Sequence, residues 1–304
     1  MDINIKHETT KFEDARPKIQ EVAVHIGLPK ALAYWSAISR WALILFAGLA
    51  PIFFLPFTNL PVAANKELLV FVLILIAFFA LLGRILIEGR MRYPGHFLTI
   101  ALVLLVLIWG ASAFLSLNQL TGLIGSWATP DSFFAVLLFS ILTYSIAATF
   151  TRKDIVLSLL AFLVSLSLLG IFELLQLFKM FILPFAFAKN AGFNPIGSVN
   201  DVGVLLAFGL VIASGLMSAP DTSRILSPYG GSASGGKKLL GLSVVIFILN
   251  LIVIDFWAIW VGLSLAMVFM ISFLSAGISK SDRFPTSKIP EVGNQETSDF
   301  EATE

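Results

Sequence analysis

Two carboxylic acids stand within apolar stretches of this sequence. Glu173 lies inside the run 155–178, and Asp255 interrupts the largely apolar run 239–277. A carboxylate at membrane depth is costly unless it is paired or hydrated, so such residues mark ion paths and catalytic acids or bases. We therefore treat Glu173 and Asp255 as candidate catalytic residues. The structural alternatives are a Glu173 that is protonated or pairs with Lys179, and an Asp255 that only serves a turn.

A loop of unusual composition follows Glu173, from residue 179 to residue 201. Its apolar piece, 181–188, is too short to span a membrane and predicts an interfacial or re-entrant helix. The polar remainder predicts an irregular loop that lines a cavity. Capping of the next helix is the alternative role of Asn200 and Asp201. The candidate substrate-binding residues are Lys179, Lys189, Asn194, Asn200 and Asp201.

The composition is that of a membrane protein. Of the 304 residues, 58% are hydrophobic and only 13% are charged, which excludes a water-soluble single domain. The absence of Cys excludes disulfides and thiolate-bound metals, and a net charge of +1 leaves no basic excess for nucleic acid. The stretch 231–238 is similar to a phosphate-binding loop, but Lys238 occupies the hydroxyl position, so we interpret the stretch as a linker. We expect no cofactor and no metal.

Eight apolar segments have about the length that a helix needs to cross a bilayer. They predict an all-α polytopic membrane protein with three parts: a cytosolic N-terminal tail with an interfacial helix (1–40, the helix at 22–38), a transmembrane helical bundle (41–277) and a disordered cytosolic tail (278–304). We expect a tight turn at 250–255 between the last two spans. Gly203 with Ala207, and Gly209 with Ala213, predict close helix packing. The predicted spans are 41–57, 68–87, 97–117, 133–150, 155–178, 202–219, 239–254 and 256–277.

The placement of positive charge predicts the orientation. When the connections between the eight spans are assigned alternately to two sides, 17 of the 20 Lys and Arg fall on one side. Lys and Arg near span ends resist translocation, so that side is cytosolic. We therefore expect both termini in the cytosol and a multi-pass protein of the plasma (inner) membrane. The outer face then carries only three cations, Lys66, Lys179 and Lys189.

One stretch resembles a known family. Residues 193–207 read FNPIGSVNDVGVLLA, which is similar to the Gly-x-x-Asn stretch that opens a central span in membrane proteins of the O-antigen ligase and polymerase family. The exit of the second span, 84–90, and the loop Gly125-Ser126-Trp127 also resemble the N-terminal half of such proteins. The resemblance implies a role in cell-envelope polysaccharide assembly. It implies transfer of a glycan from a polyisoprenyl diphosphate carrier at the outer face, by a glycosyltransferase that needs no metal.

The chain departs from the family pattern in its cations. Family members hold the diphosphate with outer arginines, whereas no Arg of this chain is predicted outside and all three His fall on cytosolic segments. Lysines are then the cations left for a diphosphate. Two alternatives follow: a divergent or truncated relative that binds a lipid-linked glycan, or one half of a site that a second polypeptide completes.

Two hypotheses of other classes compete with glycan transfer. A non-enzymatic transporter or channel subunit would use Glu173 and Asp255 as intramembrane ion ligands. A structural membrane partner would contact membrane lipids and another protein, and would bind no ligand.

Overall fold

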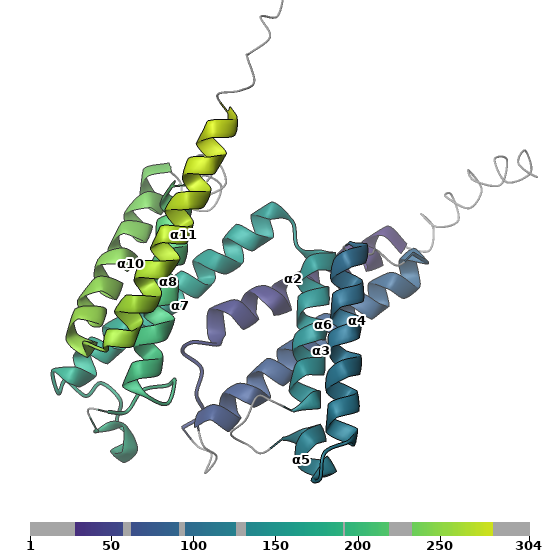
Figure 1. Cartoon of the computed structure of the whole chain (residues 1–304), viewed down its shortest axis with the longest axis horizontal. Coiled ribbons are helices and arrows are strands. Elements are labelled where there is room, and N and C mark those ends of the chain that lie inside the picture. The colour runs from purple at the N-terminus through teal and green to yellow at the C-terminus, as the bar shows by residue number, and fades with distance from the viewer. Residues whose placement is uncertain are drawn as a thin grey trace, which may run out of the picture.

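The chain folds into a set of long helices joined by loops (Figure 1). The computed structural model describes residues 28–56, 62–90, 95–125, 132–190, 192–218 and 233–281, and within these ranges there are helices and no strand. The predicted tails before residue 28 and after residue 281 lie outside the described residues. The helices are α2 (Leu28–Leu49), α3 (Val62–Glu88), α4 (His96–Phe114), α5 (Gln119–Ile124), α6 (Phe133–Thr149), α7 (Arg152–Leu177), η1 (Ala186–Ala188), α8 (Val199–Ser218), α10 (Ala233–Ile254) and α11 (Trp257–Ser281).

The helices have the length and composition of membrane spans. Within the described part of the chain, six are long and apolar enough to cross a bilayer, namely those in α2, α3, α4, α7, α8 and α10. The apolar helices Phe133–Thr149 and Trp257–Ser272 are shorter. At 1.5 Å per residue, the 17 residues of α6 reach about 26 Å, somewhat less than a hydrocarbon core of about 30 Å. The all-helical membrane class is confirmed, and each of the eight predicted segments overlaps one helix, six of which have the length and composition of a span.

The first helix differs from the prediction. We expected an interfacial helix followed by a span from residue 41 to residue 57, but α2 runs unbroken across residue 40 and ends at Leu49. Pro51 follows at once, and a proline disfavours helical geometry in the residue before it. Lys66 satisfies the carbonyls at this end, since its Nζ donates to the oxygens of Ala50 and Pro51 at 2.7 and 2.9 Å.

The predicted turn at 250–255 is also wrong in its extent. Helix α10 continues to Ile254, and α11 begins at Trp257. Asn250 is helical, and its side-chain amide donates to the carbonyl oxygen of Ile246 at 2.8 Å, within the helix. The reversal is confined to Asp255 and Phe256, where Asp255 adopts a φ of 45°.

The helices form two groups, each with its own core (Figure 1). In the N-terminal group, α2, α3 and α6 contact one another around Leu43, Ile74 and Leu142, and α4 and α5 pack on α6. In the C-terminal group, α8 contacts α7, α10 and α11, with Leu206 and Phe247 in the core. Helix α7 belongs to both, because it also packs along α2.

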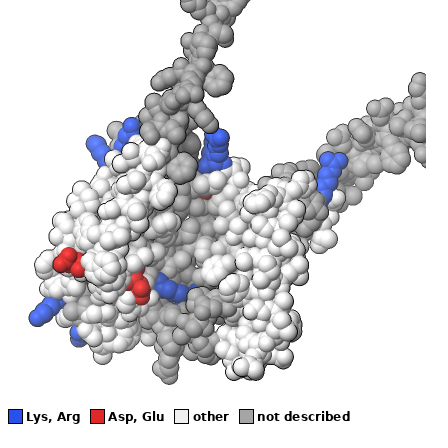
Figure 2. Space-filling model, viewed as in Figure 1, with Lys and Arg blue, Asp and Glu red and all other residues white. Residues whose placement is uncertain are grey.

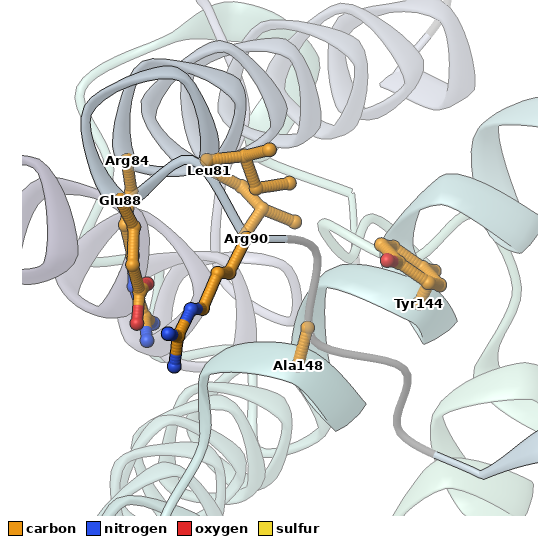
Figure 3. Close-up of a pocket in the computed structure, with 7 residues that line it drawn as sticks. Leu81, Arg84, Glu88, Arg90, Tyr144 and Ala148 are labelled. Carbon is orange, nitrogen blue, oxygen red and sulfur yellow. The ribbon is translucent and has the colours of Figure 1, made fainter. Parts of the chain in front are cut away.

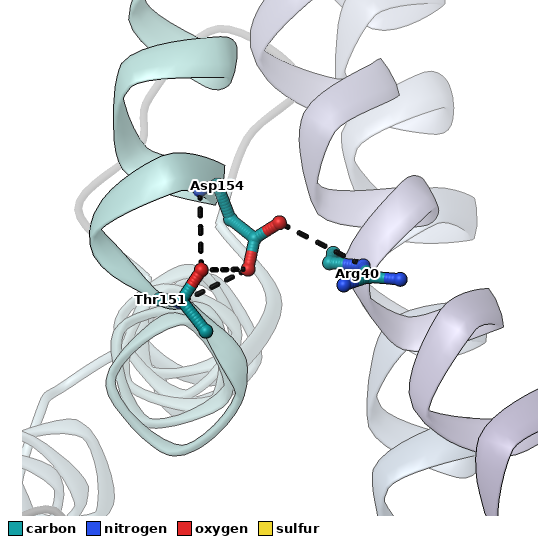
Figure 4. Close-up of polar contacts among 3 residues, drawn as sticks. All are labelled: Arg40, Thr151 and Asp154. Carbon is teal, nitrogen blue, oxygen red and sulfur yellow. Dashed lines mark hydrogen bonds and ion pairs between the residues drawn. The ribbon is translucent and has the colours of Figure 1, made fainter. Parts of the chain in front are cut away.

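A polar contact links the two groups at the start of α7 (Figure 4). The carboxylate of Asp154 lies 3.7 Å from Nε of Arg40 on α2. The same carboxylate accepts hydrogen bonds from the backbone N–H and the hydroxyl of Thr151, at 2.9 and 2.7 Å. Thr151 in turn accepts from the backbone N–H of Asp154 at 3.4 Å, which completes a capping box. The first turn of α7 is thus fixed both to its own cap and to α2.

Small residues let the C-terminal helices approach closely, as the sequence predicts. A Cβ at Gly209 would lie 2.7 Å from Leu166 Cδ1 on α7 and 3.1 Å from the ring of Phe247 on α10. A Cβ at Gly203 would overlap Cδ1 of Ile259 on α11. The absence of side chains at these two positions therefore allows three helices to contact α8.

The outer surface of the bundle suits a lipid environment. Large apolar side chains such as Phe79, Leu107 and Phe269 are exposed on the outside of their helices. Figure 2 shows a face that is largely uncharged, with Lys and Arg along its upper edge and a few charged residues toward its lower end. A monomeric soluble protein rarely exposes so continuous an apolar surface.

Candidate functional site

The predicted site residues lie at one end of the C-terminal helix group. This end is formed by the last turns of α7, the first turn of α8 and the reversal between α10 and α11. The loop after α7 is tied to it by a hydrogen bond of 3.1 Å from Nε2 of Gln176 to the carbonyl oxygen of Ala188. The reversal is packed against α8, since a Cβ at Gly203 would lie 3.4 Å from Cγ2 of Ile254. We call this end the rim.

Glu173 is fully buried beneath the rim. Its side chain has 0% exposure, and neither carboxyl oxygen has a hydrogen-bond partner in the part of the chain that the structure describes. The expected pairing with Lys179 is not formed, because Lys179 follows the end of α7 and is exposed. A carboxyl group in this setting is costly and is therefore a functional candidate in a membrane protein.

Two amide side chains accompany Glu173. Gln176 and Asn250 are also 0% exposed. Each amide nitrogen donates one hydrogen bond to a backbone carbonyl, whereas Oε1 of Gln176 and Oδ1 of Asn250 have no partner among the described residues. We call Glu173, Gln176 and Asn250 the buried polar cluster.

The close approach of α10 to α7 brings Asn250 toward Glu173. A Cβ at Gly170 would lie only 3.0 Å from Nδ2 of Asn250, so Asn250 rests directly against the backbone of α7. Glu173 is one turn further along α7, and helical side chains lean back toward the N-terminus of their helix. The carboxyl group of Glu173 therefore leans toward the level of Gly170, where Asn250 lies.

The loop above the cluster is held together by aromatic rings. Phe193 packs against Phe54, Phe172 and Phe187, with ring centroids 5.9, 6.4 and 5.3 Å away. The helix expected at 181–188 is reduced to the single turn η1, consistent with Pro184, which cannot donate a helical hydrogen bond. The ring contacts join the loop to α7 and to the segment after α2.

Asn194 shapes the loop from within. It is buried, and its Oδ1 accepts hydrogen bonds from the backbone N–H groups of Ile196 and Gly197 at 3.0 and 2.7 Å. Such side-chain bonds to the following backbone stabilise turns. The structure thus places Asn194 as a support of the loop and not on its surface.

The start of α8 is capped by Ser198. Its hydroxyl accepts from the backbone N–H of Asp201 at 3.1 Å and donates to the Asp201 carboxylate at 2.6 Å. The cap is therefore Ser198 and not Asn200 or Asp201 as expected; the Asp201 carboxylate supports it by accepting the hydrogen bond of the Ser198 hydroxyl. Asn200 and Asp201 are both exposed at the rim.

Charged side chains surround the rim. Lys179, Lys189 and Asp255 are exposed, and Lys179 and Asp255 have φ values of 61° and 45°. Such positive values are uncommon for residues other than glycine. Lys66, the third lysine expected on this side, is occupied by its two bonds to the carbonyl oxygens of Ala50 and Pro51, just beyond α2. Lys179 and Lys189 are the predicted outer lysines that remain open to a ligand.

Chemically, the rim offers two ammonium groups and two carboxylates. The lysines can bind phosphate oxygens, and the exposed carboxylate of Asp255 or Asp201 can accept a proton. Across the described ranges, no three His, Asp or Glu residues are grouped as metal ligands. The buried polar cluster presents four oxygen atoms without a donor among the described residues, a set that could accept a proton or a cation.

Sequence reasoning missed the most informative partner, Asn250. Its signal was visible as an amide within an apolar segment, but we assigned it to a turn. The organising role of Phe193 had no comparable signal, because the chain contains 28 Phe. Comparison with known protein families, with curated proteins and with solved structures finds no match for this chain.

Proposed function

We propose that this chain is a multi-pass protein of the plasma (inner) membrane that serves cell-envelope polysaccharide assembly. Its proposed ligand is a polyisoprenyl-diphosphate-linked glycan, bound at the rim on the outer face. The similarity of residues 193–207 to the O-antigen ligase and polymerase family supports this function. The structure places this stretch directly at the rim, from the aromatic contacts of Phe193 to the first turns of α8.

The proposed topology has eight crossing helices and both termini in the cytosol. Arg152 and Lys153 begin α7, and the rim lies at its other end, after 26 residues or about 39 Å of helix. Lys237 and Lys238 similarly begin α10, whose far end is the Asp255 reversal. Cations at the cytosolic ends of both helices would satisfy the positive-inside rule and leave the rim outside.

The observation that carries the proposal is the gathering of Lys179 and Lys189 at the rim beside exposed polar groups. Lysine ammonium groups would bind the diphosphate as point charges. The amide of Asn200 would hydrogen bond to sugar hydroxyl groups, and Asp255 is the exposed carboxylate available as a base where transfer takes place. Glu173 is too deeply buried to touch a ligand at the rim.

A binding experiment tests this function. The full chain in nanodiscs is titrated with a polyisoprenyl diphosphate, and binding is followed by native mass spectrometry. The double variant Lys179→Ala with Lys189→Ala is expected to bind about tenfold more weakly, because charge-assisted contacts are lost. The matched control is Lys237→Ala with Lys238→Ala, which removes an exposed lysine pair from the other end of the group. Equal weakening in both pairs, or in neither, contradicts the proposal.

Transfer is tested separately in cells. Asp255→Ala is expected to abolish surface glycan transfer while the protein stays in the membrane. If transfer continues undiminished although the lysine pair affects binding, the chain binds the glycan and a second polypeptide supplies the chemistry.

The buried polar cluster favours a second candidate function, ion-coupled transport. Glu173 with the free oxygens of Gln176 and Asn250 provides one negative charge and neutral oxygen ligands, a set that balances one proton or one monovalent cation. Asp255, the other ion ligand expected from the sequence, is exposed at the rim. Flux into proteoliposomes that is abolished by Glu173→Gln and unchanged by Asp255→Asn would support transport; unchanged flux in Glu173→Gln would exclude it.

A further inference from the structure

A pocket lies at the opposite end of the molecule from the rim, between the last turn of α3 and α6 (Figure 3). It is shallow and open: its cavity volume is about 10 Å³, room for about one water molecule, and about 220 Å³ is reached only when the open space at its mouth is included. Arg84 and Glu88 of α3 and Arg90 beyond it provide its charged wall, and Tyr144 and Ala148 of α6 face them. The start of α3 lies next to the end of α2, where Lys66 binds the carbonyl oxygen of Ala50. The segment after α2 contacts the rim loop through Phe54 and Phe193. The pocket lies at the other end of α3 and is therefore remote from the rim.

The charged wall carries one net positive charge. Arg84 is only 8% exposed, and its Nε lies 3.2 Å from the carboxylate of Glu88, which neutralises it. Arg90 is exposed and forms no ion pair within the described segments. Figure 3 shows the head groups of Arg84, Glu88 and Arg90 gathered on one side of the pocket. Guanidinium groups present several N–H donors in a plane and bind phosphate oxygens well.

The rest of the pocket is apolar. Leu81 and Ile85 from α3 and Ala148 from α6 line it. Elsewhere on the same two helices, α3 exposes Leu86, at 82% exposure, and α6 exposes Phe139, as expected of helices that face lipid. A ligand that fits must therefore combine a phosphate with an adjoining apolar chain.

We propose that the open mouth of this pocket, beside the guanidinium groups, binds the phosphate headgroup of an anionic membrane lipid. One net positive charge matches the single negative charge of a phosphodiester. The phosphate oxygens contact the guanidinium groups of Arg84 and Arg90, and the first carbons of the lipid lie against Leu81 and Ile85. Basic pockets between membrane helices are known to hold acidic lipid headgroups in this manner. This site stands on the geometry of α3 and α6 and does not depend on glycan binding at the rim.

Lipid retention tests the site. The full chain is reconstituted into nanodiscs that contain phosphatidylglycerol and phosphatidylcholine, and the lipids that stay bound are counted by native mass spectrometry. Arg90→Ala is expected to reduce the preference for phosphatidylglycerol about tenfold, the effect of losing a charge-assisted contact. Glu88→Gln is expected to increase the preference, because it leaves two uncompensated guanidinium groups. Arg84 is kept, since its removal would take away the ion-pair partner of Glu88 on α3.

Lys237→Ala is the control, because it removes one exposed cation from α10 outside the pocket. Unchanged retention in this variant supports the site, and a loss equal to that in Arg90→Ala overturns it. A Glu88→Gln variant without increased preference also overturns it. Inorganic phosphate distinguishes the source of the ligand: if phosphate alone binds in detergent and Arg90→Ala removes that binding, while phosphatidylglycerol is not selected, the lipid assignment is wrong.

Discussion

Replacing Glu173 by methionine should stabilise the protein while removing ion coupling. Both carboxyl oxygens are completely buried and lack a hydrogen-bond donor among the described residues. Methionine is unbranched and similar in length and helix propensity, so it would follow the same path without opening a large cavity. The substitution therefore removes a burial cost and leaves the packing of α7 intact.

The expected change in the free energy of unfolding follows from the two unpartnered carboxyl oxygens of Glu173. A buried polar group without a partner costs about 1–3 kcal/mol, so Glu173→Met is expected to raise the free energy of unfolding by about that amount. Gln176→Met is the matched control, one turn away and equally buried. It also removes an unpartnered oxygen, but it breaks the bond to the carbonyl of Ala188, so we expect no stabilisation.

Urea unfolding in mixed micelles, followed by tryptophan fluorescence, measures both variants against the unmodified chain. A Glu173→Met protein that loses more than about 1 kcal/mol would show that the carboxyl group is bonded in the folded protein. The inference of an unpartnered Glu173 would then be wrong, and with it the ion site. Equal stabilisation in Gln176→Met would show that the effect comes from apolarity in general and not from this carboxyl group.

Five further substitutions test the packing by the same unfolding measurement. Asp154→Ala removes the capping box and the link to α2 and should cost about 1–2 kcal/mol; Arg40→Ala removes only a half-exposed partner and should cost less than about 1 kcal/mol. Gly209→Ala inserts a methyl group between packed helices and should cost about 1–3 kcal/mol, whereas Gly241→Ala has open space and should not destabilise. Lys66→Met should cost about 1–3 kcal/mol, because the carbonyl oxygens of Ala50 and Pro51 lose their donor.

Much of the architecture could be predicted from the sequence because membrane helices are specified locally. A helix in lipid must satisfy its own backbone and present apolar side chains, so the long apolar segments coincide with the long helices. The close packing at Gly203 and Gly209 was likewise visible in their spacing. Helix ends were less accurate where a proline or a tertiary contact decided them, as with Pro51 and Lys66 at the end of α2.

The site could be predicted only in part, because its arrangement depends on contacts between distant segments. The residues singled out from the loop after α7 do gather at one end, yet the sequence could not separate their tasks. Asn194 supports the loop, Lys66 caps a helix, and Lys179 remains exposed. The partnership of Asn250 with Glu173 requires the approach of α10 to Gly170, which no local pattern encodes.

The rim and the buried polar cluster lie at different depths along α7, so the two proposed functions can be distinguished. A glycan carrier at the rim depends on Lys179 and Lys189, which are exposed, and should tolerate a neutral residue at 173 as long as α7 keeps its packing. Ion coupling depends on Glu173 and should tolerate loss of both lysines. Gln176 bonds directly to Ala188 in the loop. If Gln176→Met, which breaks this hydrogen bond, impairs both activities, the bond is the route by which the cluster positions the rim. The double lysine variant therefore tests whether glycan binding belongs to the rim. Glu173→Met, made separately, tests whether ion coupling belongs to the buried polar cluster.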